Sequence, residues 1–443
     1  MAGRFPKKIS SFQIIILGFA GVILAGALLL TLPIASQSRE WTSFADALFT
    51  STSAVCVTGL IVQDTATYWS YFGQGIILTL IQIGGIGVIA LAVFIASISG
   101  KKVSLMQRST LQDSISAHQI GGVVHMTGFI IRVVLYTELA GAILLLPVFC
   151  SNYGWAGIWM SVFHSISAFC NAGFDLMGSR TGQYSSLTGM AGNPALVIPI
   201  CLLIILGGIG FLTWSDVKTH KLHVKRYHMQ SKVILATSAV LILFPMLWLF
   251  FGEYAAEPMK DRLCLSLFQA VTPRTAGFNT SDLGALTGVG RMLIIILMLI
   301  GGSPGSTAGG MKTTTIAVLF ANATQVFRRR KNAQMFGRRV DDGTVKSAST
   351  ILVMYLFLAL LAASVISAVE GISLEKCIFE TGSAIATVGL SLGLTPTLGM
   401  LSRGILIVLM FFGRVGGLTI IYAALSARSA EVSKCPEEKI TVG

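Results

Sequence analysis

The stretch Thr387-Val388-Gly389-Leu390 follows the short apolar run 378–385, and it decides the fold that the sequence predicts. A Thr-Val-Gly tripeptide at the end of a short helix can align successive backbone carbonyl groups, as ion-channel selectivity filters do. In three other places a Phe is followed nine or ten residues later by a Gly and a large apolar residue. These places are Val57-Thr58-Gly59-Leu60, Asn171-Ala172-Gly173-Phe174 and Thr275-Ala276-Gly277-Phe278. The sequence therefore predicts four internal repeats.

The composition indicates a membrane protein. The 443 residues are 53% hydrophobic and 12% charged, with a mean hydropathy of +0.77. So few charges could not solvate the surface of a soluble fold of this size. Several long uncharged runs match the ~20 residues that a helix needs to cross ~30 Å of hydrocarbon. The first run follows Lys7 and Lys8, but its apolar part is too long for a signal peptide, so we expect a retained span.

The distribution of the net charge of +13 argues against nucleic-acid binding. Of the 32 Lys and Arg residues, 21 lie in five blocks at 4–8, 101–108, 218–232, 328–346 and the tail from 428. Much less basic loops alternate with these blocks, which is the positive-inside pattern. Both termini and three loops are therefore predicted to be cytoplasmic, where they face anionic lipid and any cytosolic partner. The seven cysteines form neither a disulfide framework nor a metal-binding pattern.

Each repeat is predicted to contain a first span (M1), a re-entrant half-helix, the Gly-containing stretch and a second span (M2). The half-helices are too short to cross the bilayer and lie at 42–54, 157–169, 261–271 and 374–385. The M1 spans are expected at 11–32, 126–149, 233–251 and 349–369, and the M2 spans at 75–99, 194–214, 292–327 and 400–425. The predicted fold is an all-α polytopic membrane protein. Eight transmembrane helices and four re-entrant half-helices would stand in pseudo-fourfold arrangement around one pore. The repeats are predicted at 1–113, 114–228, 229–346 and 347–443, and the last range includes a cytosolic tail.

Only the third M2 span is expected to break, within an intramembrane loop at 301–312. A helix cannot run straight through a Pro surrounded by glycines, and irregular backbone at membrane depth must face protein or water. The predicted gate consists of Gly302, Ser303, Pro304, Gly305, Ser306, Thr307, Ala308, Gly309, Gly310, Lys312 and Arg414. The loop is similar to a phosphate-binding loop, but its Lys is one residue out of register and no strand precedes it, so nucleotide binding is not expected.

The four Gly-containing stretches are the candidate cation site. Segments that converge on one axis can replace the hydration shell of an ion with carbonyl oxygens, and the C-terminal ends of half-helices favour a cation. The predicted filter residues are Val57, Thr58, Gly59, Asn171, Ala172, Gly173, Thr275, Ala276, Gly277, Thr387, Val388 and Gly389. The alternative is that these glycines only cap helices or permit close packing. Asp64, Asp175 and Asp282 follow three of the glycines and either attract cations or are solvated loop acids.

Arg414 is the most informative single residue. A charge in mid-span costs ~2.5–3.5 kcal/mol, so it is expected to face the pore or a partner. It stands where the other repeats have Gly85, Gly208 and Gly302. At ~10 Å from a cation and an effective dielectric constant of ~20, its repulsion amounts to roughly 1.7 kcal/mol, a barrier that does not seal the path. The alternative is a paired structural Arg.

With these features the sequence resembles the Trk/Ktr/HKT superfamily of potassium transporters over essentially its whole length. The resemblance rests on the four filter-like stretches, on Ser-Pro-Gly-Ser-Thr-Ala-Gly-Gly at 303–310, and on Phe412-Gly413-Arg414-Val415-Gly416-Gly417. The length is most similar to that of a KtrB-type membrane subunit. A Gly in all four filter positions is typical of potassium-permissive members.

The resemblance implies potassium uptake across the plasma membrane, with K⁺ held at the backbone carbonyls of the filter. It also implies that Na⁺ activates or is coupled to transport, that the 303–310 linker is a gating loop, and that Arg414 is a positive barrier. The partners it implies are a second copy of the chain and a cytosolic KtrA-like RCK regulatory ring that binds ATP or ADP.

Two other readings are open at this stage. A secondary transporter of another class would bind its solute at one midplane site between broken helices. A membrane-embedded hydrolase would need a nucleophile and a base, for which Ser303 or Ser306 with His164 are the candidates. Enzymatic activity is not expected.

Overall fold

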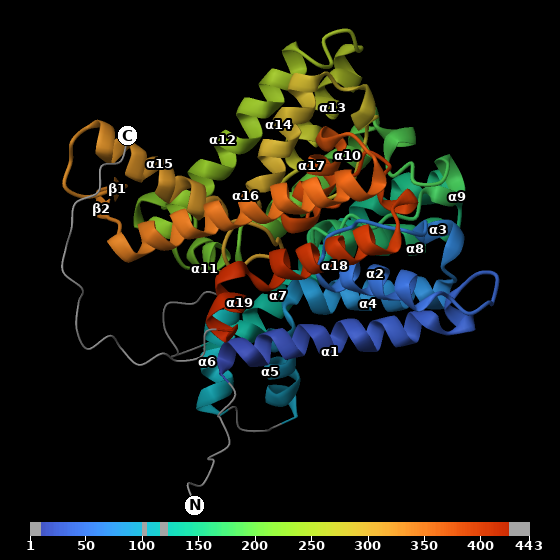
Figure 1. Cartoon of the computed structure of the whole chain (residues 1–443), viewed down its shortest axis with the longest axis horizontal. Coiled ribbons are helices and arrows are strands. Elements are labelled where there is room, and N and C mark those ends of the chain that lie inside the picture. Colours follow the sequence, from blue (N-terminus) through green and yellow to red (C-terminus); the bar gives the residue numbers. More distant parts are fainter. Residues whose placement is uncertain (1–9, 100–103, 116–122, 425–443) are drawn as a thin grey trace, which may run out of the picture.

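The computed structural model describes residues 10–99, 104–115 and 123–424 and is mostly helical (Figure 1). Four long helices correspond to the predicted M1 spans: α1 (Ser11–Thr31), α7 (Val123–Tyr153), α12 (Met229–Phe251) and α16 (Asp342–Glu370). Each is long and apolar enough to cross a bilayer. The second begins three residues before and ends four residues after its predicted range, and the fourth begins seven residues before and ends one residue after its range.

Four shorter helices correspond to the predicted half-helices. They are α2 (Phe44–Val55), α8 (Ala156–Phe169), α13 (Met259–Val271) and α17 (Leu374–Ile385). Each packs against the long helix that precedes it in the chain. Their C-terminal turns are buried, and each leads directly into one of the Gly-containing stretches.

The M2 segments differ from the prediction, because all four are broken and not only the third. They consist of α4 (Tyr71–Ile86) and α5 (Val88–Ile98), α10 (Pro194–Gly208) and α11 (Phe211–His220), α14 (Gly288–Leu299) and α15 (Thr313–Phe327), and α18 (Met400–Val415) and α19 (Gly417–Ala424). The first two pairs bend by 90° and 95°. The breaks outside the third repeat fall at Gly87, Gly210 and Gly416, whose φ angles are 95°, 96° and 92°. These left-handed values do not continue a right-handed helix.

The breaks also affect the count of membrane spans. Among the described helices, four are long and apolar enough to cross a membrane alone, or six if each strongly bent pair forms one span. The expectation of eight transmembrane helices is therefore met only in part. The end of the fourth predicted M2 span, residue 425, lies outside the described residues.

Several small elements connect the helices. Helix α6 (Leu105–Ile115) follows the first repeat, α3 (Thr65–Tyr68) and α9 (Gly178–Thr181) follow the first two Gly stretches, and 3₁₀ turns cover Pro33–Ala35, Thr188–Met190, Val224–Arg226, Leu283–Ala285 and Thr395–Thr397. A hairpin of β1 (Gln334–Met335) and β2 (Arg338–Arg339) corrects the all-α expectation. Its turn residues Phe336 and Gly337 both have positive φ, as tight hairpins require.

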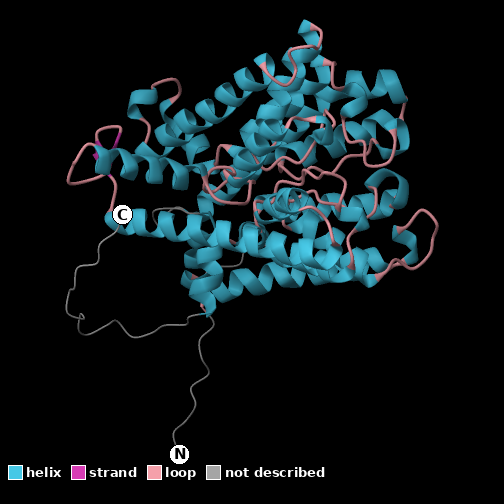
Figure 2. Ribbon diagram, turned by 45° about the horizontal axis from the view of Figure 1, so that its top comes forward, coloured by secondary structure: helices cyan, strands magenta, loops and turns pink. Residues whose placement is uncertain are grey.

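The helices contact one another in a closed ring. The first half of each M2 segment packs against the half-helix of the next repeat: α4 against α8, α10 against α13, α14 against α17, and α18 against α2. Figure 2 shows loops passing through the middle of the molecule between the surrounding helices. These loops include the Gly-containing stretches, so the candidate site lies where the four half-helices end.

Candidate functional site

The four predicted filter glycines lie next to one another. A Cβ atom on Gly59 would lie 2.5 Å from the carbonyl oxygen of Ala172 and 3.1 Å from the Cα of Gly173. A Cβ on Gly173 would meet Ala276 and Gly277, one on Gly277 would meet Val388 and Gly389, and one on Gly389 would meet Thr58 and Gly59. These contacts return to their starting point, so the glycines form a closed ring of four, which we call the glycine ring.

The backbone of each stretch has an unusual alternation of φ angles. The ring glycines have φ of 92°, 70°, 80° and 92°, and the residues two positions before them also have positive φ. Those residues are Val57 (56°), Asn171 (59°), Thr275 (70°) and Thr387 (51°). Positive φ in a β-branched residue is a genuine outlier that the surrounding structure must enforce. Alternating signs of φ let successive carbonyl groups point toward one side, as a carbonyl-lined filter requires.

Hydroxyl groups near the ends of the half-helices hold the Gly stretches. The hydroxyl oxygens of Ser53 and Ser383 accept the N–H groups of Gly59 and Gly389, at 3.1 and 3.0 Å. The hydroxyls of the corresponding Ser167 and Thr272 instead donate to the carbonyls of Phe174 and Phe278, at 2.7 and 2.5 Å. These four residues were not predicted from the sequence. Their signal is a Ser six residues before the Gly, or a Thr five residues before it in the shorter third repeat.

In the second, third and fourth repeats, the residue after the repeat Phe anchors the loop that follows the ring. Glu380 accepts the N–H groups of Leu392 and Leu394, at 3.1 and 3.3 Å. The ring nitrogen Nε2 of His164 lies 3.3 Å from the N–H of Leu176. His164 is thus a buried structural residue, and among the described residues neither Ser303 nor Ser306 hydrogen-bonds to it. The pair that a hydrolase would need is not brought together.

Two buried charged residues near the ring were also not predicted from the sequence. Arg274, three residues before Gly277, donates to the hydroxyl of Ser238 at 3.0 Å. Glu138 of α7 accepts a hydrogen bond from Gln82 at 3.0 Å and lies 3.7 Å from the sulfur of Cys170, three residues before Gly173. Both are less than a tenth exposed. The available signal was a lone charge inside an otherwise apolar stretch.

The predicted gate residues 302–310 form an irregular loop between α14 and α15, below the Gly stretches. The N–H of Ser303 donates to the carbonyl of Gly208 at 3.0 Å, and the hydroxyl of Thr307 donates to that of Phe169 at 3.0 Å. The N–H of Gly310 donates to the carbonyl of Gly413 at 3.2 Å. The loop therefore links the third repeat to the second and the fourth.

Arg414 and Lys312 are both bound to backbone carbonyl groups. The Arg414 guanidinium donates to the carbonyls of Thr307 and Gly84, which joins the loop to the end of α4 in the first repeat. The Lys312 ammonium donates to the carbonyl of Ala308 at 2.9 Å. Among the described residues, no carboxylate forms an ion pair with Arg414. These hydrogen bonds to backbone carbonyl groups also fit the alternative of a paired structural Arg.

The three aspartates that follow ring glycines in the chain differ in exposure and in hydrogen bonding. Asp64 is only 5% exposed and accepts the N–H groups of Ala66 and Tyr184, each at 3.0 Å, so it is not a solvated loop acid. Asp282 is exposed and accepts the N–H of Gly284. Asp175 is half-buried, and burial raises its pKa to about 7, with a further increase from the charge of Asp64.

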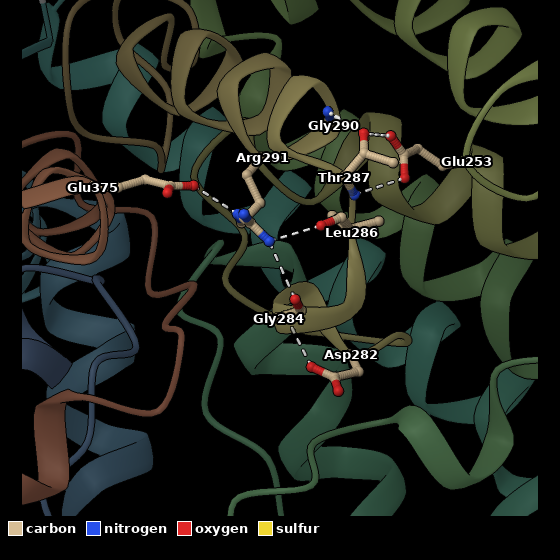
Figure 3. A network of polar contacts seen from close by, with 8 residues as sticks. All are labelled: Glu253, Asp282, Gly284, Leu286, Thr287, Gly290, Arg291 and Glu375. Atoms are coloured by element: carbon tan, nitrogen blue, oxygen red, sulfur yellow. Dashed lines mark hydrogen bonds and ion pairs between the residues drawn. The ribbon is translucent and has the colours of Figure 1, made fainter. Parts of the chain in front are cut away.

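Figure 3 shows how the exposed loop of Asp282 is fixed. Arg291 of α14 pairs with Glu375 of α17 at 2.7 Å and donates to the carbonyls of Gly284 and Leu286, at 3.2 and 2.7 Å. The same view shows Glu253 accepting hydrogen bonds from Thr287. An exposed ion pair contributes only ~0–1 kcal/mol, so this network holds the position of the loop more than it stabilises the fold.

Known proteins match this chain over nearly its whole length. Residues 6–433 match the family model of TrkH, described as a cation transport protein. The potassium/sodium uptake protein NtpJ of Enterococcus hirae is 39% identical, over 100% of this chain and 99% of its own. The Ktr system potassium uptake protein B of Bacillus subtilis is 36% identical, over 97% of this chain and 96% of its own. The crystal structure of the potassium transporter TrkH from Vibrio parahaemolyticus matches 94% of this chain and 85% of its own, with a TM-score of 0.74 at 20% identity, and this likeness shows the fold.

Proposed function

This chain belongs to the TrkH family of cation transport proteins, and we propose that it takes up potassium through the glycine ring. The family consists of transporters and not of enzymes. The long apolar helices of this chain make it a membrane protein. The names of the relatives support potassium as the transported ion. The observation that carries the proposal is the closed ring of four glycines preceded by residues of positive φ.

The ring is suited to a cation for two physical reasons. Four backbone segments meet at the ring, where their glycines lie next to one another and carry no side chains. The carbonyl oxygens of these segments can therefore surround a common axis and replace the water of a partly dehydrated K⁺. In addition, the four half-helices end directly before the ring, and each helix C-terminus carries a partial negative charge of about half an elementary charge. We assign the K⁺ sites to the backbone carbonyls of the predicted filter residues in pseudo-fourfold arrangement.

The 302–310 loop and Arg414 form the proposed gate. The loop crosses beneath the ring and hydrogen-bonds to the second and fourth repeats, while Arg414 ties it to the first. A guanidinium close to the path would repel a cation and hold the loop in its obstructing position. Transport would then require this loop to move.

We further propose a multi-pass plasma-membrane location with both termini cytoplasmic, following the distribution of basic residues. Sodium would activate transport or be coupled to it, which the name of the potassium/sodium uptake relative supports. The assembly would be a homodimer with a separate cytosolic regulatory ring of the RCK type that binds ATP or ADP. The designation of a relative as part of a Ktr system supports a multisubunit assembly.

Complementation of a bacterial strain that lacks potassium uptake tests the function. We expect the chain to restore growth at limiting potassium when it is expressed with an RCK-type subunit, and to do so better with sodium present. Rubidium influx into these cells gives the rate. Growth on another limiting cation or solute in the absence of any potassium or rubidium influx would contradict the proposal and favour a secondary transporter of another class.

Uptake is expected to fall when the external pH drops through about 7, because protonation then removes the negative charge of Asp175. For a unit charge ~15 Å from the ion, an effective dielectric constant between ~80 and ~20 gives roughly a two- to sixfold change in cation occupancy. Asp175→Asn should show the low-pH rate at all pH values. Rubidium influx between pH 6 and 8 measures this, with the exposed Asp282→Asn as the control that keeps the wild-type pH profile. An unchanged profile in Asp175→Asn would refute the assignment.

A further inference from the structure

A hollow lies at the end of the molecule that carries the loops after the glycine ring. It encloses about 640 Å³, within the ~300–1,000 Å³ typical of small-molecule sites. The turn after α1, the first turn of α4, and parts of α8 and α9 form its walls, and none of the ring glycines lines it. Figure 1 shows α3 and α9 close together at the right-hand edge, where they are in contact.

The hollow is positively charged. Arg39 and Arg180 both line it, and no Asp or Glu does. Among the described residues neither guanidinium forms an ion pair, whereas two other arginines at the same end do: Arg291 with Glu375 and Arg403 with Asp46. Arginines are also unfavoured at the outer side of a membrane protein. Two unneutralised guanidinium groups in one hollow therefore point to an anionic ligand.

Both arginines are held in place. The Arg180 guanidinium lies 5.3 Å from the ring centre of Tyr153, a cation–π contact. Arg39 has a φ of 58°, in a turn that is fixed by the hydroxyl of Ser36, which donates to the carbonyl of Glu40 at 2.8 Å. A left-handed non-Gly residue is a strained conformation, and such conformations cluster at ligand sites. The fold thus positions the guanidinium of Arg180 and the backbone that carries Arg39.

Aromatic residues set the depth of the hollow in the membrane. Trp159 in its wall donates to the side-chain oxygen of Gln74 at 2.8 Å, which joins α8 to α4. Tyr71 at its rim is 70% exposed, and Trp155, at the junction of α7 and α8, is 89% exposed. Exposed Trp and Tyr residues gather at the level of lipid headgroups. We therefore expect the hollow to lie at the depth of lipid phosphates.

We propose that this hollow binds the phosphodiester headgroup of an anionic phospholipid such as phosphatidylglycerol. Two planar guanidinium groups match the phosphate oxygens in charge and in hydrogen-bond geometry. The exposed apolar side chains Ile34 and Phe72 at the rim face the glycerol backbone and the first acyl carbons. A choline or ethanolamine group would find no carboxylate partner in the lining, so zwitterionic lipids bind more weakly. The proposal depends on the membrane location and not on which ion is transported.

Native mass spectrometry of the full chain in detergent, titrated with phosphatidylglycerol or phosphatidylcholine, tests the site. We expect the wild type to bind one phosphatidylglycerol more tightly than any phosphatidylcholine. Arg39→Gln and Arg180→Gln should each weaken this site about tenfold, as the loss of one charge-assisted hydrogen bond would. Lys260→Gln, which also removes one positive charge from an exposed position at this end, should leave the affinity unchanged.

The possible outcomes separate the sources of phosphate. Phosphatidylglycerol that stays bound in saturating inorganic phosphate supports a lipid site, whereas its displacement would overturn the proposal in favour of a small-anion site. Equal affinity for the two lipids, or the same loss in Lys260→Gln as in the arginine variants, would also overturn it. Monodisperse elution of each variant shows that a loss of binding is not a loss of folding.

Discussion

Gly389→Ser is expected to lower the preference for potassium over sodium by at least about tenfold, a loss of ~1.4 kcal/mol in discrimination. A Cβ at this position would overlap the carbonyl oxygen of Thr58 in the neighbouring repeat. The φ of 92° would also be strained for any residue other than Gly. The stretch must therefore shift, and its carbonyl groups move away from their positions around the axis. Competition of sodium against rubidium influx measures the preference.

The same chain offers a matched control for this substitution. Gly382 lies in α17, seven residues before Gly389, and a Cβ there would have no neighbour within 4 Å. Gly382→Ser adds the same side chain to the same repeat, and we expect wild-type selectivity. If Gly389→Ser is present in the membrane in normal amounts and keeps the wild-type preference, the filter assignment is wrong. Gly173→Ser is expected to behave like Gly389→Ser, because its Cβ would meet the third repeat.

Arg414→Gln is expected to raise the potassium influx roughly fifteenfold. This figure is the Boltzmann factor for removing a unit positive charge ~10 Å from the ion, at an effective dielectric constant of ~20. The substitution also removes the hydrogen bonds that tie the 302–310 loop to α4 through Thr307 and Gly84. Both losses act in the same direction, toward a more open path. Initial rates of rubidium uptake, corrected for the amount of protein in the membrane, measure the effect.

Arg414→Lys separates the two contributions. Lys keeps the positive charge but lacks the planar fork that reaches two carbonyl groups at once. An influx close to the wild type in Arg414→Lys would assign the barrier to charge, and a rise as large as in Arg414→Gln would assign it to the hydrogen bonds that hold the loop. An influx in Arg414→Gln that is equal to or below the wild type, with normal folding, would refute the gate.

Much of the architecture followed from elementary signals in the sequence. Uncharged runs predicted the long helices, because each must supply ~20 apolar residues to span the hydrocarbon. The spacing from Phe to Gly predicted the half-helices, and α17 has the predicted bounds. The Pro within the glycines of 302–310 predicted the break between α14 and α15, since Pro both removes a donor and clashes with the preceding turn.

The other three M2 breaks could not be predicted in this way. Each of these segments carries a cluster of three glycines with no Pro among them, and glycines are frequent in transmembrane helices that continue unbroken. The cause lies in tertiary contacts. A Cβ on Gly84, Gly207 or Gly413 would overlap the last carbonyl groups of the half-helices, so these glycines let the M2 backbone approach closely. Three residues after each of them, the chain turns at a left-handed Gly.

The glycines predicted from the sequence lie next to one another in the structure, but the residues that hold their stretches by hydrogen bonds were not predicted. The tripeptides stand out because they recur, whereas Ser53, Ser383 and Glu380 are ordinary residues until their hydrogen-bond partners are known. The same is true of Arg274 and Glu138, which lie behind the ring on separate repeats. Their role depends on contacts between segments that are distant in the sequence. The roles of the filter and gate residues stay predictions.

Anomalous diffraction from crystals equilibrated with rubidium locates the ion-binding sites. The account predicts a rubidium peak on the axis of the glycine ring, coordinated by backbone carbonyl oxygens from all four stretches that end at Gly59, Gly173, Gly277 and Gly389. A peak that lies instead between the broken M2 helices, away from the ring, would contradict the account and identify a midplane transporter site.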